Sequence, residues 1–421
     1  MRRTMKNIFA VAVTAALFTP MAAMATNGYF GHGIGMKSMG MGGTGIALAQ
    51  DSLASATNPA AAAAVGNRID FGLNLFRPDR KATISGTGGG CCNGSFDGNE
   101  TAIFPIPEFG YNLDLGNDRA FAITVVGRGG MNTDYDKEIL LFSGGSGVKP
   151  GIDLAQLYIS PTYAMKVNQD HSVGVTLNAI YQRFKAEGLD GFIPFSSDGA
   201  NVTSGDYSSS TGFSVGIGWT GKISSTLTAG ATYTSKASMS KLDNYSGLFQ
   251  DEGNFDIPAT AGLGIAHMMS PDVTLAIDVT KIFYSGVDTV HNPLANMFTA
   301  PLGAADSAGF GWEDMTVFKI GLSWKAANDL VMRVGLNHGD NPIPTDQTMF
   351  NILAPGVVED HITLGATKTL ANGAELTFMY MHAYENEVKG SGSIPGAPLP
   401  GGEADIRMSQ DAIGVAYGWD M

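Results

Sequence analysis

The sequence is poor in cysteine and, beyond its first 25 residues, contains no long apolar run. The two cysteines among 421 residues, Cys91 and Cys92, are adjacent and lie in a glycine-rich stretch. Their Cα atoms are about 3.8 Å apart, below the usual disulfide range of about 4.4–6.8 Å, so a bond between them would be strained. From the sequence alone we assign them no role. The absence of 18 consecutive apolar residues beyond residue 25 excludes an α-helical membrane protein.

Positive charge is scarce as well. The chain has 25 Lys and Arg against 39 Asp and Glu, a net charge of −14, which argues against binding to nucleic acid or other acidic polymers. The seven histidines are scattered without the spacing of a metal site, and the sequence has no nucleophile elbow, phosphate-binding loop or Ser–His–Asp grouping. These absences predict that the protein is not an enzyme and uses no cofactor or metal ion.

The first 25 residues have the pattern of a secretory signal. A basic start, a short apolar stretch and a small-x-small cleavage pattern follow one another at residues 2–6, 8–18 and 23–25. We therefore predict that residues 1–25 are removed and that the mature chain begins at Thr26. Loss of the three cations in this segment takes the net charge from −14 to about −17. The signal predicts export, and we expect the mature protein in the outer membrane of a Gram-negative bacterium.

Beyond residue 68 the dominant pattern is alternation of apolar with polar or small residues. Val273, Leu275, Ile277 and Val279, for example, face away from a set that includes Asp278. About fourteen candidate strands show this period of two, which is typical of β-structure with one apolar face. A weak, repeated alternation of this kind is the signature of a transmembrane β-barrel, whose lipid face is apolar and whose lumen is polar or small.

The connections between these strands alternate in length. Short turns occur at one end, whereas the long connections span about residues 188–210, 241–255, 286–312, 340–356 and 388–404. An even strand number closes the barrel without a free edge, as the bilayer requires. We therefore predict an all-β, up-and-down antiparallel transmembrane barrel of about 14 strands over residues 69–421. A large secreted β-sandwich or β-helix is the competing fold.

Residues 26–68 are rich in Gly and Ala and lack the alternation. We predict that they form an N-terminal plug inside the barrel lumen. By alternation, four charged residues of the barrel should also point inward: Asp278, Lys319, Arg333 and Glu375. Two interpretations remain open for them, a salt-bridge network that rigidifies the barrel and a polar anchor for the head group of a ligand.

An ordered set of motifs resembles the FadL/TodX family of outer-membrane transporters of long-chain fatty acids and aromatic hydrocarbons. It includes residues 27–29, 40–47, Asn58-Pro59-Ala60, 160–168, 312–314 and 341–344. The resemblance covers nearly the whole mature chain. It implies a fourteen-stranded barrel with a lumenal plug and a lateral exit where the third strand kinks. That strand corresponds here to about residues 119–128.

The resemblance also suggests site residues. Glycines weaken strand pairing, so we expect the kink and lateral gate at Gly127, Gly129 and Gly130, with the Asn58-Pro59-Ala60 motif lying against it. Fatty-acid transporters of the family hold the carboxylate with basic residues. Arg183 is the best match for one of these, although strict alternation would turn it toward lipid.

The second family lysine corresponds here to Glu313. Lys319 or Arg333 could replace it, or the ligand is an uncharged hydrocarbon. The resemblance implies a monomer that takes up hydrophobic small molecules, foremost long-chain fatty acids, by gated passive diffusion. Alternatives are uptake of aromatic or aliphatic hydrocarbons, a polar-solute porin, and a structural or adhesive surface barrel. Expected partners are the hydrophobic ligand, outer-membrane lipid and lipopolysaccharide, and the barrel-assembly machinery, but no nucleic acid.

Overall fold

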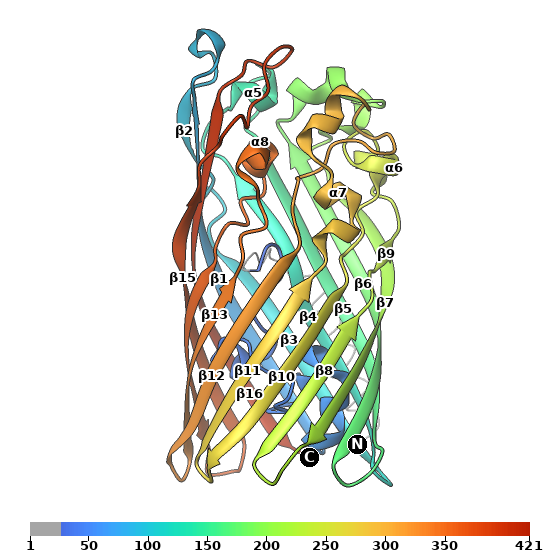
Figure 1. Cartoon of the computed structure of the whole chain (residues 1–421), viewed down its shortest axis with the longest axis vertical. Coiled ribbons are helices and arrows are strands. Elements are labelled where there is room, and N and C mark those ends of the chain that lie inside the picture. The colour runs from blue at the N-terminus through green and yellow to red at the C-terminus, as the bar shows by residue number, and fades with distance from the viewer. Residues whose placement is uncertain (1–26) are drawn as a thin grey trace.

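Fourteen strands of the described chain close into one antiparallel barrel (Figure 1). The structure is a computed structural model that describes residues 27–421, so the predicted signal peptide and Thr26 lie outside the described residues. The barrel strands are β1 (Arg68–Ser85), β3 (Phe104–Gly116), β4 (Arg119–Asp134), β5 (Gly151–Lys166), β6 (His171–Glu187), β7 (Ser208–Lys222), β8 (Leu227–Thr234), β10 (Thr260–Ser270), β11 (Val273–Ile282), β12 (Met315–Ala327), β13 (Leu330–Gly339), β14 (Asp360–Thr369), β15 (Glu375–Val388) and β16 (Glu403–Asp420). Each pairs with its neighbours along the chain, and β16 pairs with β1. The predicted fold class is confirmed.

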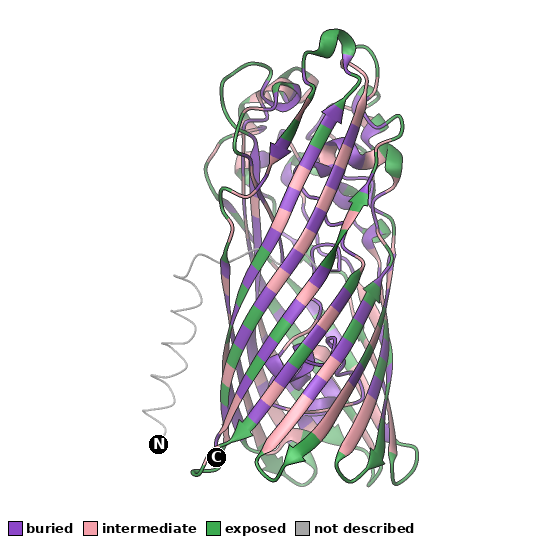
Figure 2. Cartoon of the chain, turned by 90° about the vertical axis from the view of Figure 1, so that its left-hand side faces the viewer, coloured by how far each residue is buried: buried purple, intermediate pink, exposed green. Residues whose placement is uncertain are grey.

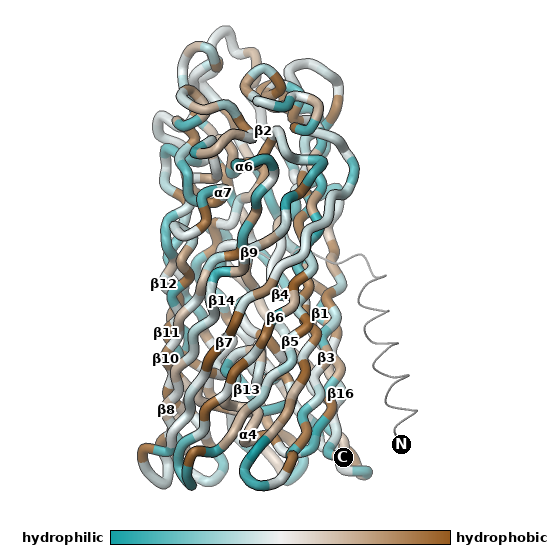
Figure 3. The backbone as a smooth tube through the Cα atoms, turned by 90° about the vertical axis from the view of Figure 1, so that its right-hand side faces the viewer, coloured by the Kyte–Doolittle hydropathy of each residue, from teal (hydrophilic) through white to brown (hydrophobic). Residues whose placement is uncertain are grey.

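The alternation in the sequence places one set of side chains toward lipid and the other toward the lumen. In the β11–β12 pair, Asp278 lies opposite Lys319 on the inner face, and Val279 lies opposite Phe318 on the outer face. Buried and exposed residues consequently alternate along the strands (Figure 2), and apolar stretches recur along the wall (Figure 3). A shift of one residue would turn every side chain of a strand to the wrong face, so this pattern fixes the register.

The two ends of the barrel differ, as predicted. Short turns join the strands at the end where the C-terminus lies, and long connections with short helices cover the other end (Figure 1). In outer-membrane barrels the short turns are periplasmic and the long loops extracellular. The long connections contain β2 (Gly94–Asp97), β9 (Ser238–Met239), α5 (Leu140–Ser143), η3 (Asp190–Phe195), α6 (Gln250–Gly253), α7 (Asp288–His291), η7 (Leu294–Phe298) and α8 (Thr348–Asn351). None of the helices in the described residues has the length and apolarity to cross a membrane.

Residues 27–67, here called the plug, lie inside the barrel (Figure 1). They form α2 (Met36–Met39), α3 (Ala54–Thr57), η1 (Pro59–Ala61) and α4 (Ala62–Val65), joined by irregular chain. Short helices of this kind, isolated in sequence, depend on packing against the wall rather than on their own propensity. The prediction of a lumenal N-terminal plug is therefore confirmed, whereas the position at which the mature chain begins stays a prediction.

Glycines on the inner wall make room for the plug. A Cβ atom added to Gly335 would meet the backbone of Met41 and Gly42, and one added to Gly230 would meet the backbone of Ile46. Other close approaches to the plug occur at Gly110, Gly174, Gly218, Gly262, Gly264, Gly321, Gly365 and Gly414. Glycine in a strand often marks such a close approach of another backbone segment. The small inner residues seen in the sequence thus form the seat of the plug.

Replacing Gly335 by valine should prevent the plug from seating, because the new side chain would occupy the space of Met41 and Gly42. We expect the variant to fold as a barrel but to show a higher and noisier ion conductance in planar bilayers. Ala229→Val, which adds similar bulk on the outer face of β8, is the matched control and should conduct like the wild type. Equal, low conductance of both variants would mean that the plug does not depend on this contact.

Candidate functional site

The wall is interrupted between β3 and the upper half of β4. The two strands pair only as far as Glu108 opposite Val126. Immediately beyond, the register of β4 against β5 shifts between Gly127 and Gly129, which makes Arg128 the extra residue of a β-bulge. The upper half of β4 then pairs with β5 alone among the barrel strands. The position predicted for a kink therefore carries a bulge and an open strand edge, while its use as a gate remains a prediction.

The start of the plug covers this edge from inside. The amide of Gly31 donates to the carbonyl oxygen of Arg128 at 3.3 Å, and the amide of Gly130 donates to the carbonyl of Tyr29 at 2.9 Å. The hydroxyl of Tyr284 donates to the carbonyl of Asn27 at 2.7 Å and holds the segment in place. Residues 29–31 thus satisfy part of the β4 edge that β3 leaves unpaired.

A lumenal cavity lies directly behind the bulge. Its floor and sides come from the plug residues Phe30, Ile34 and Ile46, from Gly127 and Arg128 of β4, and from inner residues of β8 and β10–β12 that include Asp278 and Lys319. The cavity therefore extends from the interrupted part of the wall to the opposite strands. Apolar plug side chains and a small number of charged groups share its lining.

The charged side chains at this cavity differ in the contacts that they make. The carboxylate of Asp278 accepts hydrogen bonds from the plug amides of Gly45 at 2.7 Å and Ile46 at 3.0 Å. Within residues 27–421, the ammonium of Lys319 makes one hydrogen bond, a long contact of 3.5 Å to the carbonyl oxygen of Gly43, and lies across the strand pair from Asp278. The Arg128 guanidinium lies 5.4 Å from the centre of the Tyr158 ring. Both cations line the cavity, and neither forms a close ion pair among the described residues.

Arg333, a predicted carboxylate anchor, is used elsewhere. Its guanidinium donates to Gln50 Oε1 at 3.0 Å and to Thr367 Oγ1 at 2.7 Å, and the residue is buried. It therefore joins the plug to the wall and does not line the cavity.

Arg183, the other anchor suggested by the resemblance, faces outward. β6 continues as far as Glu187, so strict alternation holds at Arg183. Its guanidinium lies 4.7 Å from the centre of the Tyr207 ring and 3.5 Å from the carboxylate of Asp153. Of the three predicted cations, only Lys319 lines the lumenal cavity.

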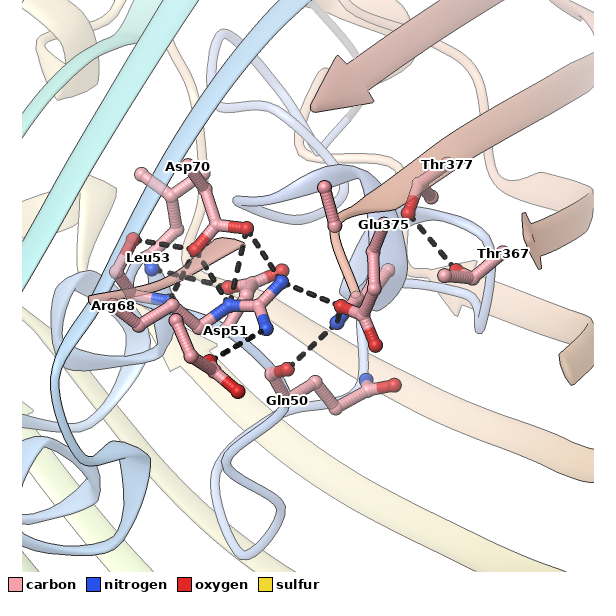
Figure 4. Close-up of polar contacts among 12 residues, drawn as sticks. Gln50, Asp51, Leu53, Arg68, Asp70, Thr367, Glu375 and Thr377 are labelled. Carbon is pink, nitrogen blue, oxygen red and sulfur yellow. Dashed lines mark hydrogen bonds and ion pairs between the residues drawn. The ribbon is translucent and has the colours of Figure 1, made fainter. Parts of the chain in front are cut away.

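An ion-pair network holds the lower part of the plug (Figure 4). The guanidinium of Arg68 lies 2.8 Å from Asp70 and 2.5 Å from Glu375, and Lys37 of the plug shares the Glu375 carboxylate at 2.6 Å. Burial, followed by the neighbouring Asp70 carboxylate, raises the pKa of Asp51 to about 6. For Glu375 the contacts thus favour the rigidifying network over a ligand anchor.

A second set of contacts holds the upper part of the plug against β13 and β14. The amide of Gly42 donates to Thr363 Oγ1 at 2.8 Å, and its carbonyl accepts from Asn337 Nδ2 at 3.1 Å. The imidazole of His32 stacks on that of His361 with 6.1 Å between ring centres. Burial lowers the pKa of His32 to about 3, so this ring is neutral at physiological pH. Plug and wall therefore meet here through neutral groups.

A second, apolar pocket lies among the extracellular connections. It is lined by Ile152, Phe184, Leu189, Phe192, Leu248, Phe249, Thr289, Leu302, Ala308, Gly309, Phe310, Phe350 and Leu353, without a charged side chain. A run of aromatic rings leads from it toward the lumen. Phe184 lies 6.5 Å from Phe255, Phe255 lies 6.4 Å from Tyr29, and Tyr29 lies 4.9 Å from Phe30, all between ring centres. Buried aromatic side chains therefore separate the two pockets.

The sequence matches, over residues 12–419, the family of outer membrane protein transport proteins (OMPP1/FadL/TodX). The chain belongs to this family. Similar solved structures include a Pseudomonas aeruginosa FadL homologue (TM-score 0.71, 16% identity) and the P. putida toluene transporter TodX (TM-score 0.66, 18% identity), each aligned over 93% of this chain and 99% of the other. At such identities the likeness shows the fold. No curated protein sequence matches this chain. The family and the outer-membrane location predicted from the sequence are confirmed.

In this FadL/TodX-family barrel the Asn58-Pro59-Ala60 motif does not lie against the bulge, contrary to the expectation. Asn58 Nδ2 donates to the carbonyl of Trp219 at 3.0 Å, and Pro59 packs where Gly174 and Gly218 leave space on β6 and β7. The motif seats here because both strands carry an inward-facing glycine at the same level. The plug segment that contacts the bulge is residues 29–31 instead.

Sequence reasoning missed Arg128 as a cavity residue. Alternation alone assigns residue 128 to one face, but a bulge inserts an extra residue and can re-aim its side chain. The available signal was the position of this arginine between Gly127 and Gly129 in an otherwise regular strand. Glu313, by contrast, is exposed in the connection before β12 and does not line the cavity.

Proposed function

We propose that this FadL/TodX-family barrel takes up hydrophobic small molecules, foremost long-chain fatty acids, and releases them sideways beside the β4 bulge. The observation that carries the proposal is the lumenal cavity that reaches the bulge and presents Arg128 and Lys319 to its occupant. The similar structures include one named as a FadL homologue. We also propose that export removes residues 1–25 and that residues 26–68 serve as the plug domain of a monomer.

The proposed route has three parts. A ligand first enters the apolar pocket among the extracellular connections and displaces the aromatic rings of Phe255 and Tyr29. It then occupies the lumenal cavity. Release into the membrane follows when residues 29–31 leave the β4 edge. Each CH₂ group kept out of water is worth about 0.8 kcal/mol, so a lateral exit avoids the cost of passing a long alkyl chain through the aqueous periplasm.

Charge favours a fatty acid in the lumenal cavity. A carboxylate beside Arg128 and Lys319 would form charge-assisted hydrogen bonds, which are stronger than neutral ones in a dry site. Such bonds contribute roughly 1.5–3 kcal/mol each. In this proposal Lys319 keeps the role predicted for it from the sequence, and Arg128 takes the role predicted for Arg183 and Arg333.

A second candidate function is the uptake of hydrocarbons. It is favoured by the upper pocket, whose lining carries no charge, and by neighbours named as toluene transporters and a monoaromatic hydrocarbon channel. In this case Arg128 and Lys319 would stabilise the packing of the lumen and would not contact the ligand. The filled lumen argues against a polar-solute porin, because a porin needs an open aqueous channel.

Replacing a cavity cation should separate these functions. We expect Lys319→Met and Arg128→Met each to weaken oleate binding to the purified protein by about tenfold or more, the equivalent of about 1.4 kcal/mol. Binding of an uncharged alkane of equal length should stay almost unchanged. Lys325→Met, an exposed lysine of the same strand as Lys319, is the control. Equal losses for both ligands would assign the two cations a structural role.

Uptake by whole cells completes the test. A transporter-null host that expresses the wild-type chain should accumulate labelled oleate faster than labelled toluene. Faster accumulation of toluene, together with unchanged oleate binding in the two variants, would support the hydrocarbon function instead.

A further inference from the structure

The cysteine pair lies in the connection between β1 and β2, at the end of the barrel that carries the long, extracellular connections (Figure 1). Cys91 is exposed and Cys92 is 8% exposed. The two sulfur atoms are only 2.9 Å apart and are in direct contact. The adjacent thiols therefore point toward the same place, although neighbouring side chains of an extended chain normally point in opposite directions.

The local backbone creates this arrangement. Gly89 and Gly90 adopt φ angles of 66° and 67°, a backbone conformation that residues other than glycine rarely adopt. The hydroxyl oxygen of Thr87 accepts a hydrogen bond from the amide of Cys92 at 3.3 Å, and the same hydroxyl donates to Asn93 Oδ1 at 2.8 Å. The hydrogen bonds of Thr87 to Cys92 and Asn93 thus stabilise a turn that brings the two thiols together.

Within the chain each of these thiols has the other as its one possible disulfide partner, because the 421 residues contain two cysteines. Proteins of the outer membrane pass through the periplasm, which is an oxidising compartment. We infer that Cys91 and Cys92 are a modification site and are oxidised to a vicinal disulfide during export. The oxidant is a protein disulfide of the periplasm.

The chemistry is a thiol–disulfide exchange in two steps. The thiolate of the exposed Cys91 attacks one sulfur of the oxidant, so that a mixed disulfide forms and the other sulfur of the oxidant leaves as a thiolate. The sulfur of Cys92 then attacks the sulfur of Cys91 and releases the second sulfur of the oxidant. Overall the two thiols lose two electrons and two protons, and the oxidant becomes a dithiol.

The resulting bond should be easy to reduce. Adjacent Cα atoms are closer than the usual disulfide range, and the strain of such a bond makes it more reducible. Mild reductant should therefore open the ring in the folded protein, without affecting the barrel, since the site lies in an extracellular connection.

The test uses the full-length protein in isolated outer membranes. Free thiols are blocked with N-ethylmaleimide before solubilisation, and the peptide that contains Cys91 and Cys92 is analysed by mass spectrometry. We expect a peptide without maleimide that is lighter than the dithiol form by two hydrogen atoms. After mild reduction both cysteines should react. The heat-dependent electrophoretic shift of the barrel should be the same before and after reduction.

Single variants control for access. Cys92→Ser leaves Cys91 without a partner, and its thiol should react with maleimide without prior reduction; Cys91→Ser tests Cys92 in the same way. Two reactive thiols in the unreduced wild type, an unreacted peptide with the mass of the dithiol, or disulfide-linked dimers on a non-reducing gel would each overturn the inference.

Discussion

Deleting residues 28–66 should convert the closed barrel into an open pore for small polar solutes. The plug fills the lumen and is held there by contacts with the wall, including the ion pair of Lys37 with Glu375, a carboxylate that Arg68 of β1 also contacts. Each of the fourteen wall strands pairs with both of its neighbours along at least part of its length, so the barrel should still close. Its inner wall is polar or small, as a water-filled channel requires.

Planar-bilayer recordings measure this effect directly. We expect large, stable conductance steps for the deletion variant and almost none for the wild type, together with entry of small polar antibiotics into cells. The heat-dependent electrophoretic shift of a folded barrel is the control for assembly. A folded variant with wild-type conductance would show that the segment does not occlude the lumen.

Filling the gap beside the bulge should block uptake without preventing ligand binding. By register Gly127 and Gly130 lie opposite Leu157 and Ala155 on the outer face of β5, and a Cβ at Gly127 would approach Ile106 of β3. Valine at both positions adds bulk to the opening and favours regular strand pairing. Gly129 is left unchanged, because a side chain there would strike Tyr29 and Gln156.

The double variant should take up labelled oleate at least about tenfold more slowly, the result of a barrier raised by about 1.4 kcal/mol. Binding of oleate to the purified protein should persist, since Arg128, Lys319 and the plug side chains of the cavity are unchanged and the new Cβ at residue 127 is directed at Ile106 of β3. Ala179→Val, on the outer face of the intact β6 wall, is the matched control. Normal uptake at normal surface expression would remove the lateral exit from this part of the wall.

The sequence was sufficient to predict the barrel because its pattern has a period of two. Every strand must turn one face to lipid and one to the lumen, so alternation reports both the strand and the direction of its side chains. Asp278, Lys319, Arg333 and Glu375 all face inward as predicted. The same rule correctly turned Arg183 outward, where the family resemblance alone would have placed it at the ligand.

The sequence could not predict the site itself because the site depends on the path of the plug. An inward-facing cation can bind a ligand only if the plug leaves it exposed to the cavity. The guanidinium of Arg333 is covered by its hydrogen bond to Gln50 of the plug, whereas Lys319 lines the cavity. Likewise, the position of the Asn58-Pro59-Ala60 motif depends on Gly174 of β6 and Gly218 of β7, which are distant from it in sequence. The bulge at Arg128 breaks the alternation from which all other directions were inferred.

Photo-crosslinking of a fatty acid tests the central claim most directly. The probe is an oleate analogue with a diazirine near its carboxyl end, irradiated with the purified barrel and mapped by mass spectrometry. The account predicts labels on cavity residues such as Phe30, Ile34 and Arg128, and loss of these labels when excess unlabelled oleate is added. Labels confined to the outer wall, unaffected by the competitor, would contradict it.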